Sequence, residues 1–278
     1  MMIKHRTLMG LLGAVVFAMI SVGASAGEVL DRVMSTNVLT MSSDPGYPPQ
    51  SFLDDKNEMD GFDIEVGREI AKRMGAELEV VTPAWEIITA GSWGGRWDIS
   101  VGSMTPTTER AEVLSFPVVY YYTPAAFAVH VDSPVTEVAE LNGKIIGVCG
   151  GCTYEAYLNK TLVVDAEGVP PFTFDVTAGE MRTYETDTNV FDDLRLGDGV
   201  RLDAVLTARP TVEEAIKNGY PLKVIGKAPF YEPLAVAIDK GDEEFAAKVK
   251  EVVDSMHEDG TLSELSVKWY GVDLTKVE

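Results

Sequence analysis

An arginine stands a few residues after a strand-like run, in a segment rich in small and hydroxyl residues. The segment begins with Gly102, Ser103, Met104 and Thr105. The hydroxyls of Ser103 and Thr105 suit an anion, and the planar guanidinium of Arg110 matches a carboxylate through two parallel N–H···O bonds. The alternative is that Arg110 pairs with Glu109 or Glu112 on a solvated helix face. The segment therefore indicates either a carboxylate site or a surface ion pair.

A second segment that could take part in binding or chemistry is the glycine-rich stretch 147–154. It holds both cysteines of the chain, Cys149 and Cys152. Its glycines would let backbone N–H groups approach an anion at the start of the following helix, although an ordinary turn is the alternative. In an exported protein the two cysteines are expected to form a disulfide. Free thiols, and redox chemistry of a C-x-x-C pair at a helix start, stay open as alternatives.

The elements that must position these residues alternate between strand-like and helix-like runs. The strand-like runs are 38–41, 78–81, 98–101, 125–131, 145–148, 205–206, 224–225 and 234–238. The helix-like runs are 62–74, a start at 107–113, and 243–257 with Gly260 as its C-cap. This alternation predicts an α/β protein with mostly parallel sheets. The Gly-, Pro- and acid-rich segment 162–186 is expected to be a surface excursion with one strand.

Composition narrows the class of protein. The 278 residues include 23 Lys and Arg against 44 Asp and Glu, which gives a net charge of −21. Such an acidic surface argues against partners that are nucleic acids or anionic membranes, because binding them needs clustered cations. At 46% hydrophobic residues the chain is globular rather than disordered or fibrous.

The first 26 residues resemble a secretory signal peptide. Lys4 and Arg6 precede an apolar run over 8–22, and the small residues of 24–26 form an A-x-A cleavage pattern. The mature chain is expected to begin at Gly27 in the periplasm, without a lipid anchor because no cysteine lies near the cleavage site. The alternative for the apolar run is a membrane anchor.

Four segments in order carry a family resemblance. They are 58–81, 98–116, 141–158 and 266–274. Over residues 37–272 the chain resembles the periplasmic solute-binding proteins of polar amino-acid ABC transporters, the family 3 extracellular solute-binding proteins. The resemblance implies a type 2 clamshell of two lobes, each a mostly parallel sheet flanked by helices, joined by two hinge strands. It places lobe 1 at 27–123 plus 228–278 and lobe 2 at 124–227, with a ligand in the cleft between them.

The resemblance also implies roles for single residues. Arg110 matches the residue that grips the ligand's α-carboxylate, and Cys152 and Thr153 fall where similar proteins place hydroxyl residues. Tyr47 and Trp85 match positions that sandwich the ligand's side chain, and Phe52 belongs to the same loop as Tyr47. Asp44 matches an acid that can meet a cationic side chain. Aromatic residues are more often core than site, and Trp93 and Trp97 are expected only to pack.

The chain departs from the family pattern at Ala208, where similar proteins hold the ligand's ammonium with an aspartate. A desolvated ammonium without a carboxylate partner is costly. Either Asp187 substitutes, or the ligand lacks a free α-amino group. Arg209 beside the vacant position would suit a second anionic group on the ligand.

These observations together predict a soluble, monomeric periplasmic protein that captures a small polar solute, an amino acid or a derivative, and delivers it to a membrane ABC permease. No cofactor is expected, and no metal, because His130 and His257 are far apart in sequence and distant from the cysteines. The competing classes are a cyclohexadienyl-dehydratase-like enzyme using Glu86 and Asp187, a thiol redox protein using the cysteine pair, and a binding protein recruited for signalling. No hydrolase, zinc-protease or nucleotide-binding motif is present in the sequence.

Overall fold

The computed structural model describes residues 27–166 and 169–276, so the predicted signal peptide lies outside the described residues. Its strands form one large mixed sheet with the order β5-β1-β6-β12-β7-β10-β8-β9, with β11 also paired to β7. These strands are β1 (Val38–Ser42), β5 (Glu77–Val81), β6 (Ile99–Met104), β7 (Leu114–His130), β8 (Ile145–Cys149), β9 (Glu180–Tyr184), β10 (Ala204–Ala208), β11 (Leu222–Ile225) and β12 (Tyr231–Asp239). A small sheet of β2 (Gly46–Tyr47), β3 (Ser51–Leu53) and β4 (Met59–Asp60) lies beside it.

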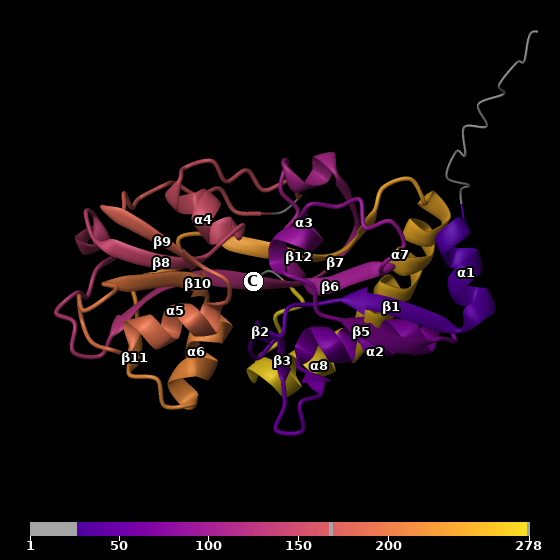
Figure 1. Ribbon diagram of the computed structural model, residues 1–278, viewed down its shortest axis with the longest axis horizontal. Coiled ribbons are helices and arrows are strands. Elements are labelled where there is room, and N and C mark those ends of the chain that lie inside the picture. The colour runs from indigo at the N-terminus through magenta and orange to yellow at the C-terminus, as the bar shows by residue number, and fades with distance from the viewer. Residues whose placement is uncertain (1–26, 167–168, 277–278) are drawn as a thin grey trace, which may run out of the picture.

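Helices flank the large sheet at both ends of the molecule (Figure 1). They are α1 (Glu28–Thr36), α2 (Phe62–Arg73), α3 (Trp85–Thr89), α4 (Thr153–Leu158), α5 (Asp187–Leu194), α6 (Arg209–Lys217), α7 (Glu243–Glu258) and α8 (Thr261–Tyr270), with 3-10 turns at Arg110–Glu112 and Val138–Leu141. Parallel pairing joins β5, β1 and β6 at one end and β10, β8 and β9 at the other. The α/β alternation predicted from the sequence is confirmed.

The two ends are joined by the long strands β7 and β12, which run antiparallel through the middle of the molecule (Figure 1). The first half of β7 pairs with β12, and its second half pairs with β10 and β11. The sequence predicts only the second half of β7, because Pro117 and Pro124 interrupt the strand-like pattern of the first half.

Separate hydrophobic cores define two lobes. One core packs α2 and α7 against β1 and β6, around residues such as Phe62, Ile70 and Val249. Two further clusters fill the other end, around Ile146 and Val190. We call these ends lobe 1 and lobe 2.

One local feature differs from the sequence-based expectation, and another agrees with it. The predicted helix start over 107–113 is only the 3-10 turn at Arg110–Glu112, because Leu114 already enters β7. Gly260 lies just past the end of α7, as expected: it follows the C-cap Asp259 and is left-handed, the position and conformation typical of a helix-ending glycine. Gly260 also precedes α8 as its N-cap, with a φ of 85° that glycine adopts without strain.

The excursion between α4 and α5 contains the one expected strand, β9, and a segment that reaches lobe 1. Residues 162–166, which we call the strap, pair with the loop that leads to Arg110 through a bridge between Val164 and Thr107. The Thr108 N–H donates to the Val163 carbonyl at 3.2 Å, and the Asp165 N–H donates to the Pro106 carbonyl at 2.9 Å. The strap therefore adds a contact between the lobes beyond the two long strands. Within 27–166 and 169–276, no helix is long and apolar enough to cross a membrane.

Candidate ligand-binding site

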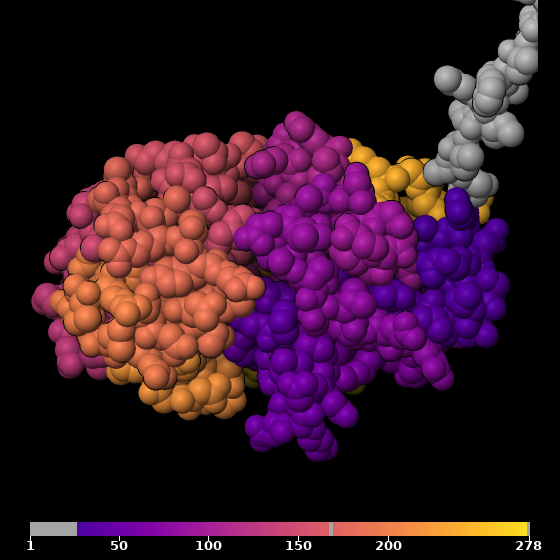
Figure 2. Space-filling model, in the orientation of Figure 1, coloured from indigo at the N-terminus to yellow at the C-terminus, as the bar shows by residue number. Residues whose placement is uncertain are grey.

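A small cavity of about 40 Å³ lies where the two lobes meet. Figure 2 shows the lobes touching along a seam on the face in view, so the cleft is closed there. Its lining comes from both lobes and from the joining strand β12. The lining residues are Asp44, Tyr47, Trp85, Gly102, Ser103, Thr105, Arg110, Cys149, Cys152, Thr153, Tyr154, Glu185, Asp187 and Glu232.

The structure brings most of the predicted site residues to this cavity. Those that line it are Asp44, Tyr47, Trp85, Ser103, Thr105, Arg110, Cys152, Thr153 and Asp187. Tyr47 and Trp85 are not in plain loops, since Tyr47 ends β2 and Trp85 begins α3. Trp93 and Trp97 are buried packing residues, as predicted.

Three predicted site residues lie elsewhere. Phe52 packs edge-on against Trp269, with ring centres 5.9 Å apart. Met104 is fully buried in a lobe 1 cluster. Arg209 is exposed and its Nε donates to Glu213 at 2.7 Å, so it offers no second anion site in the cavity.

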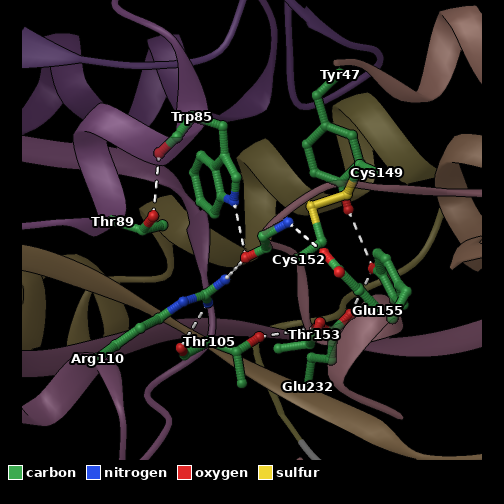
Figure 3. The surroundings of a disulfide bond; sticks show 12 residues. Tyr47, Trp85, Thr89, Thr105, Arg110, Cys149, Cys152, Thr153, Glu155 and Glu232 are labelled. Carbon is green, nitrogen blue, oxygen red and sulfur yellow. Dashed lines mark hydrogen bonds between the residues drawn. A yellow bond between two sulfur atoms is a disulfide. The ribbon is translucent and has the colours of Figure 1, made fainter. Parts of the chain in front are cut away.

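Arg110 is buried, with 8% of its surface exposed, and its guanidinium reaches both lobes (Figure 3). Nη1 donates to the Thr105 carbonyl and Nη2 donates to the Gly151 carbonyl, each at 2.9 Å. The guanidinium carbon lies 5.4 Å from the centre of the Trp85 ring, a cation–π distance. Burial lowers the pKa of Arg110 to about 10, so the side chain stays charged at neutral pH. Arg110 is therefore a cleft cation and not a residue of a solvated helix face.

The two cysteines form a disulfide at the cavity wall, with their Cα atoms 5.6 Å apart (Figure 3). Between them Gly151 adopts a φ of 70° and presents its carbonyl to lobe 1. This oxygen accepts from Arg110 and, at 3.3 Å, from Trp85 Nε1. The N–H groups of Gly150 and Gly151 are already bonded within lobe 2, at 2.9 and 2.7 Å. These two N–H groups are therefore not free for a ligand, contrary to the expectation. The loop instead offers the Gly151 carbonyl to lobe 1.

Glu232, on β12, is a cavity residue that the sequence analysis missed. Only 3% of it is exposed, and its carboxylate accepts hydrogen bonds from both lobes. Thr105 Oγ1 donates at 2.9 Å, Tyr154 Oη donates at 2.5 Å, and Thr153 Oγ1 donates as well (Figure 3). Burial raises the pKa of Glu232, and the charge of Arg110 acts in the opposite direction. A single acid before an otherwise apolar strand, in the sequence FYEPLAVAI, was the available signal.

The sequence suggested that Ser103 offers free polar groups to an anion. In the structure its hydroxyl and its N–H are both already hydrogen-bonded. The residue has a φ of 53°, its N–H donates to Tyr120 Oη at 2.9 Å, and its Oγ donates to Asp63 at 2.8 Å. Tyr120 Oη donates to the same carboxylate at 2.7 Å. Burial raises the pKa of Asp63 to about 7, against these two hydrogen bonds. Ser103 is thus held from behind by a buried polar network of lobe 1.

Asp187 is the first residue of α5 and is 3% exposed. Its Oδ1 has no hydrogen-bond partner among the residues that the structure describes. Burial raises the pKa of Asp187 to about 7, and the charges of Asp44 and Glu232 act in the same direction. Ala208, where the family places its aspartate, is fully buried in the core of lobe 2 and does not line the cavity.

A two-lobed α/β fold that closes on a polar cavity through two connecting strands defines a type 2 periplasmic binding protein. Residues 39–272 match the family described as bacterial extracellular solute-binding proteins, family 3, and the chain belongs to this family of ABC-transporter solute-binding proteins.

Named relatives support this class. The chain is 30% identical over 276 residues to the L-cystine-binding protein TcyJ of Escherichia coli K12, covering 98% of this chain and 97% of the relative. It is 25% identical over 275 residues to the L-arginine-binding protein of Pseudomonas aeruginosa, with 96% and 97% covered.

Solved structures agree with this assignment. The ancestral amino acid-binding protein AncCDT-1, a precursor of cyclohexadienyl dehydratase, superposes with a TM-score of 0.76 at 28% identity, over 87% of this chain and 100% of that one. The substrate-binding protein of an amino acid ABC transporter gives a TM-score of 0.73 at 26% identity, over 84% and 99%. The neighbour linked to the dehydratase is itself named a binding protein, so the comparison does not favour the enzyme alternative.

Proposed function

We propose that this protein captures an amino acid or an amino-acid derivative in the periplasm and delivers it to an ABC permease. The observation that carries the proposal is Arg110, a buried cation in a closed cavity between two lobes. A guanidinium in this position suits the carboxylate that all such ligands share. Its cation–π contact with Trp85 and its hydrogen bond to the Thr105 carbonyl, both within lobe 1, hold the guanidinium in place before the ligand arrives.

The two-lobe division proposed here keeps 27–123 and 228–278 in lobe 1 and 124–227 in lobe 2. The separate cores support this division, since the first cluster draws on both flanking segments and the other two draw on the middle segment. The exception is Phe230, just beyond the boundary, which packs in the core of lobe 2. The boundaries fall within β7 and just before β12, where a hinge would act. Hinge closure would bring Gly151 and Thr153 of lobe 2 to Arg110 and Thr105 of lobe 1.

In this proposal the ligand's carboxylate lies against Arg110, and its side chain lies between Tyr47 and Trp85. Both aromatic residues line the cavity, and Tyr47 Oη lies 3.4 Å from Tyr154 Oη of the other lobe. Aromatic walls desolvate a bound solute at a low cost in conformational entropy.

Neither catalytic alternative gains support from the site. Glu86 is exposed and does not line the cavity, so the pair of Glu86 and Asp187 on which the enzyme alternative depended is not brought together. The Gly151 carbonyl inside the disulfide loop accepts from Arg110 and Trp85, contacts that support a positioning role for the loop and not redox exchange. We therefore propose a binding protein without catalytic activity, exported and acting as a monomer.

A ligand screen tests this function. Mature protein (27–278) would be screened by thermal shift against amino acids, opines, betaines and dicarboxylates. A ligand at a hundred times its Kd adds about 2.7 kcal/mol of stability. Stabilisation by one or a few amino acids or derivatives, verified by calorimetry, supports the proposal. A protein that no member of the panel stabilises contradicts it.

A further inference from the structure

Ser103 is a cavity residue held in a conformation that serine disfavours. Its φ is 53°, in the left-handed region, where the Cβ of an L-residue crowds the backbone. Four other non-glycine residues in the described part of the chain have a positive φ, and all four are exposed: Asn37, Asn57, Ser92 and Lys160. Ser103, in contrast, is only 9% exposed. Its conformation therefore has to be stabilised by neighbouring residues of the protein.

Two buried side chains supply this stabilisation. The Ser103 N–H donates to Tyr120 Oη at 2.9 Å, and Ser103 Oγ donates to Asp63 at 2.8 Å. Tyr120 Oη in turn donates to the other oxygen of the same carboxylate at 2.7 Å, which closes a ring of three hydrogen bonds. Asp63 and Tyr120 are fully buried, and neither is among the described residues that line the cavity. They therefore fix both the backbone and the side chain of Ser103 from outside the cavity.

An irregularity in β7 brings Tyr120 into this position. Tyr121 pairs with Leu234 and Val119 pairs with Ala235, so Tyr120 is an extra residue between two paired positions, a β-bulge. Regular alternation would direct Tyr120 and Tyr121 to opposite faces of the sheet, but here both hydroxyls reach the same serine. β-Bulges are frequent next to functional sites, where they redirect a side chain. The bulge and the left-handed φ are therefore parts of one local arrangement.

The conformation of Ser103 affects the residue that holds Arg110. Ser103 lies one residue before the end of β6, so its φ sets the direction in which the chain leaves the strand. Two residues later, the Thr105 carbonyl accepts from Arg110 Nη1 at 2.9 Å, and Thr105 Oγ1 donates to Glu232 at 2.9 Å. If Ser103 relaxed to a β conformation, Thr105 would be displaced, and with it the hydrogen bond that holds the guanidinium.

We propose that Asp63 and Tyr120 are positioning residues for ligand binding, which hold Ser103 in the left-handed conformation that places Thr105 and Arg110. The inference rests on the proposed function, because it concerns the ligand of the same cavity. Without the two side chains, part of the molecules would adopt the β conformation at Ser103. The apparent affinity would then fall by the fraction of molecules that keep the binding-competent conformation.

The substitution Ser103→Gly tests the inference, because glycine adopts a positive φ without support from its neighbours. Calorimetry would use the amino acid or derivative that gives the largest thermal shift, at pH 8, where Asp63 is ionised and can accept both hydrogen bonds. Tyr120→Phe should weaken binding about tenfold, which corresponds to the cost of the left-handed region for an L-residue. Ser103→Gly should bind like the wild type, and so should Ser103→Gly combined with Tyr120→Phe.

Asp63→Asn is a second, independent variant, since an amide offers one acceptor atom where the carboxylate offers two. It should also lose affinity, and Ser103→Gly should restore it. Tyr220→Phe is the matched control, because it removes another tyrosine–aspartate hydrogen bond, to Asp192 at 3.1 Å, on the surface of lobe 2. This control should bind like the wild type.

Urea unfolding separates positioning from stability. Tyr120→Phe should lower the unfolding free energy with either residue at position 103, but should lower affinity only with serine there. The inference is overturned if Tyr120→Phe and Asp63→Asn keep the wild-type affinity, or if they lose as much affinity in the Ser103→Gly background as in the wild type. Either result would leave the proposed function intact, whereas a wild type that binds no member of the panel overturns the proposed function as well.

Discussion

The guanidinium of Arg110 donates to the carbonyl of Gly151 across the cleft, at 2.9 Å. The first residue follows β6 of lobe 1, and the second lies inside the disulfide loop of lobe 2. The bond therefore couples the conformation of the disulfide loop to the cation that we propose as the carboxylate anchor. It also gives Arg110 a partner in the closed state, which limits the cost of burying its charge.

Reducing the disulfide should lower both the stability of the protein and its affinity for the ligand. The Cys149–Cys152 loop is short, so its loss costs only about 2 kcal/mol of unfolding free energy in the loop-entropy estimate. Freed from the disulfide, Gly151 would hold its carbonyl less firmly against Arg110, and ligand affinity should fall by about tenfold, as for one hydrogen bond to a charged group.

Calorimetry with and without reductant, on the wild type and on a Cys149→Ser, Cys152→Ser double variant, measures this effect. The double variant should match the reduced protein and should not respond to reductant. Equal affinities of oxidised and reduced wild type would show that the disulfide does not position the loop for binding.

The strap should slow ligand release. Asp165→Pro removes the N–H that bonds the Pro106 carbonyl, and with it one of the backbone bonds that join the strap to the Arg110 loop. At about 1 kcal/mol for one hydrogen bond, dissociation should accelerate about fivefold in stopped-flow experiments. Val163→Ala is the control, since the Val163 side chain is exposed and only its carbonyl takes part. An unchanged dissociation rate in Asp165→Pro would mean that the strap does not restrain opening.

Ionisation of Asp63 should destabilise the ligand-free protein. Its pKa is raised to about 7 in the folded state from an unfolded value near 4, so the carboxyl favours folding while protonated. This contribution is complete below about pH 4 and is lost as the pH rises toward 7. The wild type should therefore lose unfolding free energy on the order of a few kcal/mol between pH 4.5 and pH 8, measured by urea unfolding. Asp63→Asn should not show this loss. A variant with the same pH profile as the wild type would contradict the assignment.

Sequence patterns predicted the fold better than the exact lining of the site. The strand-like and helix-like patterns predicted the α/β alternation. The order of the family motifs predicted that Arg110 and the cysteine loop lie in different lobes, on opposite sides of the cleft. Met104 was grouped with Ser103 and Thr105 by proximity, although alternation along β6 directs neighbouring side chains to opposite faces. The single acid of the strand marked Glu232 as unusual, but its contact with Thr105, 127 residues away in sequence, exists only through the fold.

Local chemistry also left two residues ambiguous. Arg209 follows Ala208, where an aspartate was expected, and this suggested a site for an anion. In the structure Arg209 forms an ion pair with Glu213, one helical turn later. Whether Asp187 faces solvent or the cleft depends on how α5 packs against β8 and β10, which no local pattern reveals. The unpaired state of its carboxylate is visible only in the folded structure.

The central claim is that Arg110 holds the carboxylate of an amino-acid ligand, and one calorimetric comparison tests it most directly. The best amino acid and its α-amide would be titrated into the wild type, Arg110→Ala, Arg110→Lys and the control Arg209→Ala. The wild type and Arg209→Ala should prefer the acid over the amide strongly. Arg110→Ala should lose about 2–5 kcal/mol of binding free energy for the acid and little for the amide, and lysine should restore little because it lacks the planar fork. Equal binding of acid and amide by the wild type, or undiminished affinity of Arg110→Ala for the acid, would contradict the account.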